Sequence, residues 1–224
     1  MDTCASAQGS KRCDGLEIPL QGDASLVELR IPEPVLRAVL ICRHGGFDRV
    51  GDGGSRREPA DRAGLANATA GQLAGGVATY EGQPARDENA LAAAWVDLGA
   101  QFDASAGSDR FSVQLRSLTD PAILPRAVAL AAQQLARPTW PEAVWQRDRE
   151  RLLASLKEAE NRPGTQAGRA FARAVYGQHP YGFQPDAATF NAINVADMQA
   201  FYRRHVVTCR AQVTLVGAID RAQA

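Results

Sequence analysis

Side chains with the chemistry for catalysis or metal binding are few in this chain of 224 residues, and their spacing is unfavourable. Two imidazoles bind one metal ion from a single helix when they stand about four residues apart, and no two histidines do so here. No two cysteines show the spacing of a zinc knuckle. The residues concerned are His44, His179, His205, Cys4, Cys13, Cys42 and Cys209. We interpret the histidines as structural and the cysteines as unpaired thiols. No serine–histidine–acid motif, P-loop or dinucleotide-binding glycine motif indicates another chemistry.

The stretch over residues 54–76, GSRREPADRAGLANATAGQLAGG, predicts a loop followed by a helix. Asp61 is the candidate N-cap of a helix over residues 62–74, because its carboxylate can accept a hydrogen bond from a free backbone N–H. Within that helix, Gly64 and Gly71 would each lower stability by about 1 kcal/mol relative to alanine.

Five segments resemble, in order and spacing, the first half-domain of the pitrilysin/insulinase family of metallopeptidases. They are GSRREPADRAGLAN, LGAQFDASAGSDRFSVQLRSL, RDRERLLASLKEAENRPGTQA, YGQHPYG and FYRRHVVTCRAQVTLVGAID. No one segment is decisive, but five in the expected order are a specific signal. The likeness is greatest to bacterial two-subunit relatives, in which one chain keeps the zinc motif and its partner has lost it.

Active members of this family carry an H-x-x-E-H motif, whose two histidines bind zinc while the glutamate acts as general base. In the same register the histidine positions are Asn67 and Gly71, and the glutamate position is Ala70. The third zinc ligand, a glutamate on a later helix, falls on Ser155 or Lys157. The resemblance therefore implies no catalytic residue and no cofactor in this chain, with zinc expected only in a partner subunit.

The resemblance also identifies a candidate substrate-binding strand. In active relatives an edge strand beside the zinc pairs with an extended peptide substrate by strand addition. The matching residues are Phe102, Ala104 and Ser105. An ordinary sheet strand explains the same residues, so both interpretations stand.

Helices and strands are expected in an irregular order, which is typical of the α+β class. Residues 101–106 and the strictly alternating residues 111–118 flank a Gly-Ser-Asp turn. This pattern predicts a hairpin in a mixed, mainly antiparallel sheet with helices packed on one face. Besides residues 62–74, helices are expected over residues 88–98, 121–136, 141–160, 166–176 and 195–204, and a further strand over residues 211–216. Asp87 and Asn194 are the candidate N-caps of the helices over residues 88–98 and 195–204. The charged run over residues 147–151 is interpreted as a solvated helix face.

Residues 1–53 form an irregular N-terminal segment, in which residues 26–29 and 35–42 are candidate short strands. Pro32 and Pro34 interrupt the pattern of the first of these. Residues 54–224 correspond to the insulinase-like half-domain, and we expect that unit to be truncated at its C-terminus, since relatives continue further.

Composition excludes several classes of partner. The chain has 25 basic and 25 acidic residues and a formal net charge of zero, which gives no general attraction for nucleic acid. No apolar run is long enough to span a bilayer. The N-terminus lacks the order of a signal peptide, which predicts a cytoplasmic protein. A periplasmic location is expected instead if a leader is missing, because bacterial relatives of the family are often exported.

Three functional hypotheses follow from these observations. The first is a non-catalytic subunit that pairs with a zinc-bearing homologue and helps to enclose and bind peptide substrates. The second is an active zinc endopeptidase whose ligands lie in another register. The third is a truncated or decayed remnant without independent function. Whether the chain is itself an enzyme stays open among these hypotheses.

Overall fold

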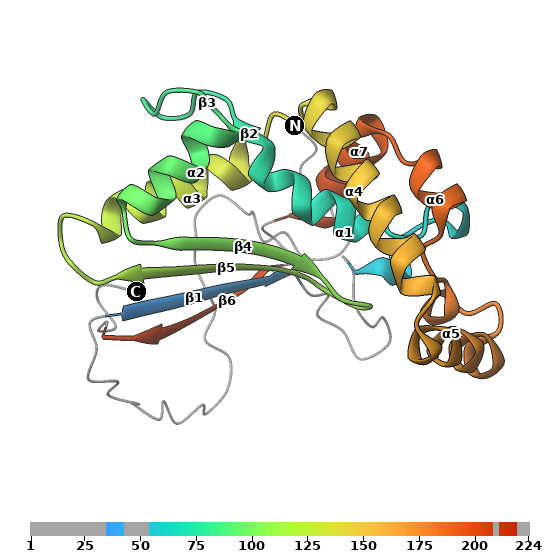
Figure 1. Cartoon of the computed structure of the whole chain (residues 1–224). Helices are drawn as coiled ribbons and strands as arrows, with labels where there is room; N and C mark the ends of the chain where they lie inside the picture. The colour runs from blue at the N-terminus through green and yellow to red at the C-terminus, as the bar shows by residue number, and fades with distance from the viewer. Residues whose placement is uncertain (1–34, 43–53, 208–210, 219–224) are drawn as a thin grey trace, which may run out of the picture.

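A computed structural model describes residues 35–42, 54–207 and 211–218 (Figure 1). For residues 35–42, 211 and 212 the backbone alone is considered. The candidate strand at residues 26–29 lies outside the described residues. So do His44, Cys4, Cys13 and Cys209.

Four antiparallel strands form the main sheet, in the order β4-β5-β1-β6. They are β1 (Val35–Cys42), β4 (Gln101–Ala106), β5 (Phe111–Leu118) and β6 (Ala211–Gly217). β1 is an interior strand that pairs along its length with β5 and with β6. The candidate strand at residues 35–42 is therefore present, and it shares one sheet with strands that follow residue 54. A second, two-stranded sheet joins β2 (Gly76–Val77) to β3 (Arg86–Asp87).

Helices pack on one face of the main sheet, as Figure 1 shows, which confirms the predicted α+β class. α2 and α3 lie over β4 and β5, while α1, α4, α6 and α7 gather beside them and α5 lies at the periphery. The helices are α1 (Leu65–Gln72), α2 (Glu88–Asp97), α3 (Leu124–Ala136), α4 (Glu142–Glu160), α5 (Pro163–Tyr176), α6 (Ala187–Ala192) and α7 (Val195–His205). Single 3-10 turns are η1 (Ser55–Arg57), η2 (Ala60–Arg62), η3 (Leu73–Gly75) and η4 (Pro180–Gly182).

The predicted N-caps of two helices are confirmed. The Asp87 side chain accepts a hydrogen bond from the backbone N–H of Ala90 at the start of α2, at 2.8 Å. At the start of α7, Asn194 accepts one from Asp197 at 2.9 Å. By contrast α3 begins at Leu124 and not at residue 121, because residues 121–123 form a turn closed on Asp120.

The core forms where alternate residues of β5 meet the helices. Phe111, Val113 and Leu115 are buried, whereas Gln114 and Arg116 are exposed, as the alternation predicts. One hydrophobic cluster surrounds Trp145 of α4 together with residues of α1 and α7. A second lies under α2 and α3, where Trp95 stacks on Phe102 with ring centroids 5.6 Å apart. The two clusters fix α1 and β4, the elements that carry the predicted site residues.

Candidate functional site

The N-terminus of α1 is held by a buried carboxylate. Glu58 is 7% exposed, and its two oxygens accept hydrogen bonds from the backbone N–H of Gly64 at 2.6 Å and of Ala66 at 2.8 Å. Burial raises the pKa of the Glu58 carboxyl, and the backbone hydrogen bonds only partly offset this effect. The prediction that Asp61 caps a helix beginning at residue 62 is wrong. The Asp61 carboxylate pairs with Arg62 at 2.8 Å, and the helix starts at Leu65.

Gly64, the N-cap of α1, has no room for a side chain. Its φ of +100° lies in the left-handed region. A Cβ built at this position would stand 2.8 Å from the ring of Phe190, which is itself buried. Gly64 is therefore a structural requirement of this turn, and not a weak point inside a helix.

The middle of α1 presents the positions of the zinc motif. Asn67 and Gly71 are both exposed and lie one turn apart on the same face, whereas Ala70 is 4% exposed and points inward. A Cβ built on Gly71 would meet no atom within 4 Å. The two histidine positions thus share an open surface that would accept larger side chains.

Asp148 of α4 is an acidic residue that contacts α1. Its Oδ2 accepts a hydrogen bond from Nε2 of Gln72 at 2.9 Å, and Gln72 is almost fully buried. Ser155 and Lys157, the residues expected to match the third zinc ligand, are exposed further along α4. Sequence reasoning missed Asp148 because the mixed-charge run over residues 147–151, to which it belongs, was interpreted as a solvated helix face.

β4 is an edge strand of the sheet. Among the described strands it pairs with β5 alone, and its other edge lies beside α1. Phe102 and Ala104 are half-buried and pack against the core, while Ser105 is exposed on the opposite side of the strand. The three predicted substrate-binding residues therefore lie on the expected edge but face two directions. Substrate binding by them stays a prediction.

The β4–β5 turn is held by the first and fourth family-like segments. The backbone N–H of Ser55 donates to the carbonyl of Gly107 at 2.9 Å, and a Cβ on Gly54 would stand 2.3 Å from the carbonyl oxygen of Ser108. The Tyr181 hydroxyl donates to Asp109 at 2.6 Å, and this bond raises the pKa of Tyr181. Asp109 is thus a tertiary anchor as well as a turn residue.

No sequence profile of a known protein family matches the chain, and no curated protein matches it in sequence. Solved structures, however, share the fold. The M16 peptidase inactive domain from Pseudomonas fluorescens has a TM-score of 0.73 and 27% identity, over 85% of this chain and 43% of that one. This chain is an insulinase-like half-domain.

Two further structures show the same fold at lower identity. The periplasmic protease PqqL from Escherichia coli has a TM-score of 0.68 and 16% identity, over 85% of this half-domain and 20% of that chain. Pitrilysin has a TM-score of 0.63 and 20% identity, over 84% of this half-domain and 19% of that chain. The half-domain spans less than half the length of each of the three structures.

The side chains at and around the zinc-motif positions of α1 do not fit zinc. Catalytic zinc is held by three protein ligands drawn from histidine, cysteine and carboxylate side chains. On α1 the matching positions offer an amide and two residues without a donor, and across from them stands the single carboxylate of Asp148. Within the described ranges, no three histidine, cysteine or acidic side chains lie close enough to hold a metal ion. We therefore derive no zinc-dependent step for this chain.

The two histidines within the described residues have structural surroundings. His179 accepts the backbone N–H of Tyr181 through Nδ1 at 3.2 Å and packs edge-on against the Tyr181 ring at 4.6 Å. His205 is buried at the end of α7, with its ring 4.6 Å from that of Phe201. Both contacts support the structural interpretation made from the sequence.

The first charged residues of the run in α4 form ion pairs with each other and with α2. The Arg147 guanidinium donates two hydrogen bonds to Glu88 of α2, at 2.7 and 2.6 Å, and two more to Asp148. The hydrogen bond from Arg147 lowers the pKa of Glu88 and raises that of Arg147 itself. The charged run over residues 147–151 was predicted to be solvated, but its first two members instead tie α4 to α2 and α1.

Along the part of the chain that the structure describes, no helix is long and apolar enough to cross a membrane.

Proposed function

We propose that this half-domain is a non-catalytic unit that pairs with a zinc-bearing insulinase-family homologue and supplies wall and peptide contacts to a shared chamber. The observation that carries the proposal is α1. Its N-terminal N–H groups bond to Glu58 and its inner face is buried, yet Asn67 and Gly71 present no zinc ligand on its open face. A non-catalytic unit would need the folded helix but not the zinc ligands.

Similar structures support the pairing. The half-domain matches 43% of a chain that is described as an M16 peptidase inactive domain, and 39% of a first half of PqqL. Each of those chains is therefore long enough to contain a second unit of this size. By analogy, we infer that this half-domain works beside a second one.

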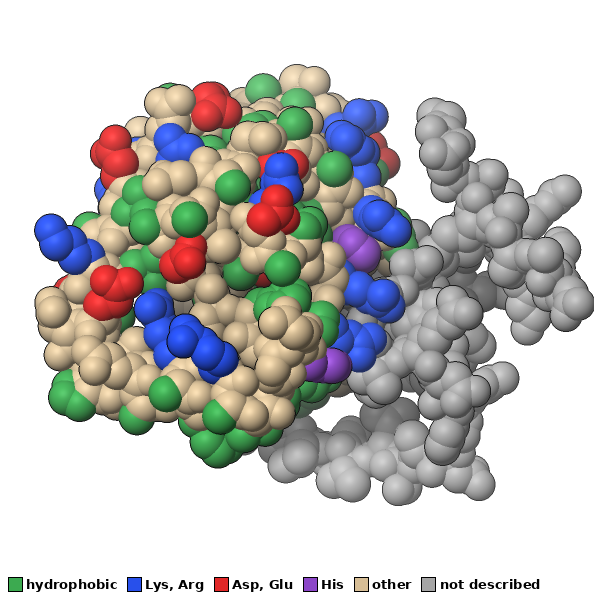
Figure 2. Space-filling model, turned by 90° about the vertical axis from the view of Figure 1, so that its right-hand side faces the viewer, with side chains coloured by type: hydrophobic (Ala, Val, Ile, Leu, Met, Phe, Trp, Pro, Cys, Tyr) green, Lys and Arg blue, Asp and Glu red, His purple; other side chains and the backbone are tan. Residues whose placement is uncertain are grey.

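An exposed apolar surface on α5 supports the pairing independently. α5 contributes no buried residue to the fold, and its Phe171 and Val175, one turn apart, are 65% and 56% exposed. In Figure 2, which looks onto the side where α5 lies, hydrophobic side chains line the lower edge of the molecule. Large apolar side chains that are adjacent and exposed are typical of protein interfaces.

The edge of β4 that pairs with no described strand supports peptide contact. An unpaired strand edge offers backbone N–H and C=O groups that an extended peptide can pair with. The side chains of Phe102, Ala104 and Ser105 would then lie beside the peptide. This role is proposed for the paired state, in which the partner would bring the zinc motif.

Co-expression with a homologue that carries H-x-x-E-H tests the pairing. Size-exclusion chromatography with light scattering should find a one-to-one complex, and Phe171→Asp with Val175→Asp should weaken it at least tenfold. Val96→Asp is the matched control, because Val96 is 78% exposed on α2, away from α5. Failure of the wild-type chain to associate with such homologues would contradict the proposal.

A further inference from the structure

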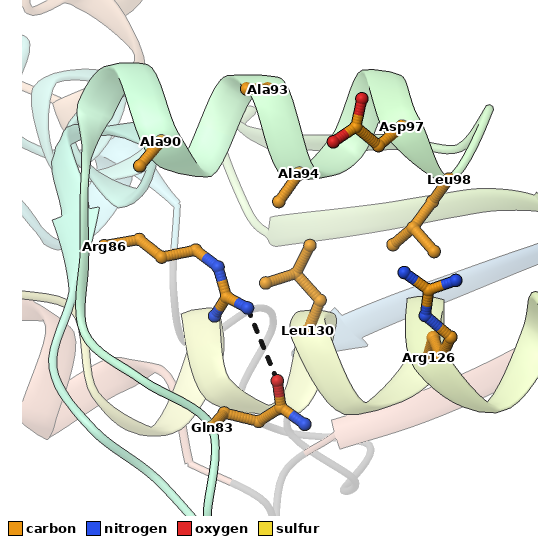
Figure 3. Close-up of a pocket in the computed structure, with 9 residues that line it drawn as sticks. All are labelled: Gln83, Arg86, Ala90, Ala93, Ala94, Asp97, Leu98, Arg126 and Leu130. Atoms are coloured by element: carbon orange, nitrogen blue, oxygen red, sulfur yellow. Dashed lines mark hydrogen bonds between the residues drawn. The ribbon is translucent and has the colours of Figure 1, made fainter.

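A groove of about 450 Å³ lies between α2 and α3, apart from the α1 face and the β4 edge (Figure 3). Ala94, Leu98 and Leu130 supply its apolar floor. Arg86 stands at one end and Arg126 at the other. The groove has the size of a small-molecule site, and its lining combines apolar side chains with charged ones.

Arg86 is held in position by hydrogen bonds to a buried side chain and to the backbone. Its Nη1 donates to Oε1 of Gln133 at 2.8 Å and to the carbonyl of Pro84 at 3.1 Å. Gln133 is fully buried, and its Nε2 donates to the carbonyls of Ala78 and Pro84, both at 2.8 Å. The guanidinium is therefore oriented before any ligand arrives, which lowers the entropy lost on binding.

No carboxylate of the described residues pairs with Arg86. The acidic side chains next in sequence are occupied elsewhere: Asp87 caps α2, and Glu88 pairs with Arg147. The bonds that fix Arg86 come from neutral oxygens, so its charge is not compensated. Figure 3 shows the guanidinium extending from the end of the groove toward Leu130. A positioned cation without a counter-charge is suited to bind an anion.

Charges at the opposite end of the groove offset each other. Arg126 of α3 and Asp97 of α2 both lie there, so that end is polar without a net charge. The positive potential of the groove is consequently greatest at Arg86. A ligand with one negative group would place that group at the Arg86 end and lay its remainder over the floor.

We propose that this groove binds a ligand that joins one carboxylate to a compact aliphatic group. The carboxylate accepts two hydrogen bonds from Arg86, and the aliphatic group covers Ala94 and Leu130. A free aliphatic acid and the C-terminus of a short peptide ending in leucine share this chemistry. The site is independent of the proposed partner, since every residue that forms it belongs to α2, α3 and the segment before α2.

Titration of the full-length, ¹⁵N-labelled chain tests the site directly. N-acetyl-leucine should shift amide resonances of α2 and α3 saturably, and N-acetyl-leucinamide, which lacks the charge, should bind at least tenfold more weakly. A pentapeptide ending in leucine that binds more tightly than N-acetyl-leucine would identify a peptide C-terminus as the ligand. Equal affinity would identify the free acid.

Variants separate the groove from the rest of the surface. Arg86→Gln should weaken binding of N-acetyl-leucine at least tenfold, and Ala94→Phe should do the same by filling the floor. Arg204→Gln, an exposed control on α7, should have no effect. Circular dichroism would confirm that each variant is folded. Equal affinity for the acid and the amide, no saturable shift, or unchanged binding by a folded Arg86→Gln variant would each overturn the proposal.

Discussion

The N-terminal end and the middle of α1 differ in how strongly the fold determines their residues. At the N-terminal end of α1, Glu58 holds two backbone N–H groups and Gly64 fits against Phe190 with no space to spare. In the middle of the same helix, Asn67 and Gly71 face open surface. Packing therefore restricts which residues can stand at the N-terminal end of α1. In the middle of the helix, only a catalytic or binding role would restrict them. The fold therefore fixes the N-terminal end of α1, while the middle of the helix offers open positions without a histidine or a carboxylate.

The largest effect is expected at Gly64. Replacing it with alanine puts a Cβ 2.8 Å from the Phe190 ring on a residue whose φ is +100°. We expect Gly64→Ala to lower the free energy of unfolding by about 2–4 kcal/mol, from left-handed strain together with the steric clash. Urea denaturation measures this change. A loss no greater than that of an exposed surface substitution would show that the α1 entry is not fixed as described.

A smaller loss is expected at Glu58. Glu58→Ala leaves the backbone N–H groups of Gly64 and Ala66 buried without their acceptors, which should cost about 1–3 kcal/mol. Chemical denaturation at neutral pH checks this value. Asp61→Ala is the control and should change stability little, since the Asp61 side chain is exposed and does not cap the helix.

Glu58 should also make stability depend on pH. Burial raises the pKa of its carboxyl, so the folded state binds this proton more tightly than the unfolded state does. The stabilisation is complete below the unfolded pKa, about 4.3, and is lost as pH rises through the higher folded pKa. Denaturation curves across that window should show this decline in the wild type, and Glu58→Gln should remove it. A decline that persists in the variant would assign it to another group.

The smallest effect, and one of opposite sign, is expected at Gly71. A Cβ there meets nothing within 4 Å, and the residue is an exposed position inside a helix. Gly71→Ala should therefore raise the free energy of unfolding by about 0.5–1 kcal/mol. Urea denaturation of Gly71→Ala and Gly64→Ala compares the same substitution at the middle and at the N-cap of one helix. Loss of stability in both variants would remove the contrast between the two regions.

Local signals in the sequence predict much of this fold. The alternation of β5 and the caps Asp87 and Asn194 depend on neighbouring residues, and the structure confirms each of them. β1 was harder to place, because its central position comes from pairing with two distant strands and not from its own pattern.

Contacts between distant residues explain what the sequence did not indicate. Glu58 caps α1 through a loop that folds back over six to eight residues, so it carries no local capping signature. Asp148 meets Gln72 across 76 residues of chain, which no spacing rule within a helix could indicate. The place of Asn67, Ala70 and Gly71 on one short helix, by contrast, could be predicted, because the resemblance fixes their register. That these positions bind no zinc stays a prediction.

Zinc stoichiometry tests the central claim most directly. After co-expression with an H-x-x-E-H homologue, metal analysis of the purified one-to-one complex should find about one zinc ion. The same complex should cleave peptides. Replacing the homologue's two zinc-binding histidines should abolish both the metal and the activity while the complex still forms. If a full equivalent of zinc stayed with this chain in the altered complex, or with this chain alone, the half-domain would have a metal site of its own, contrary to this account.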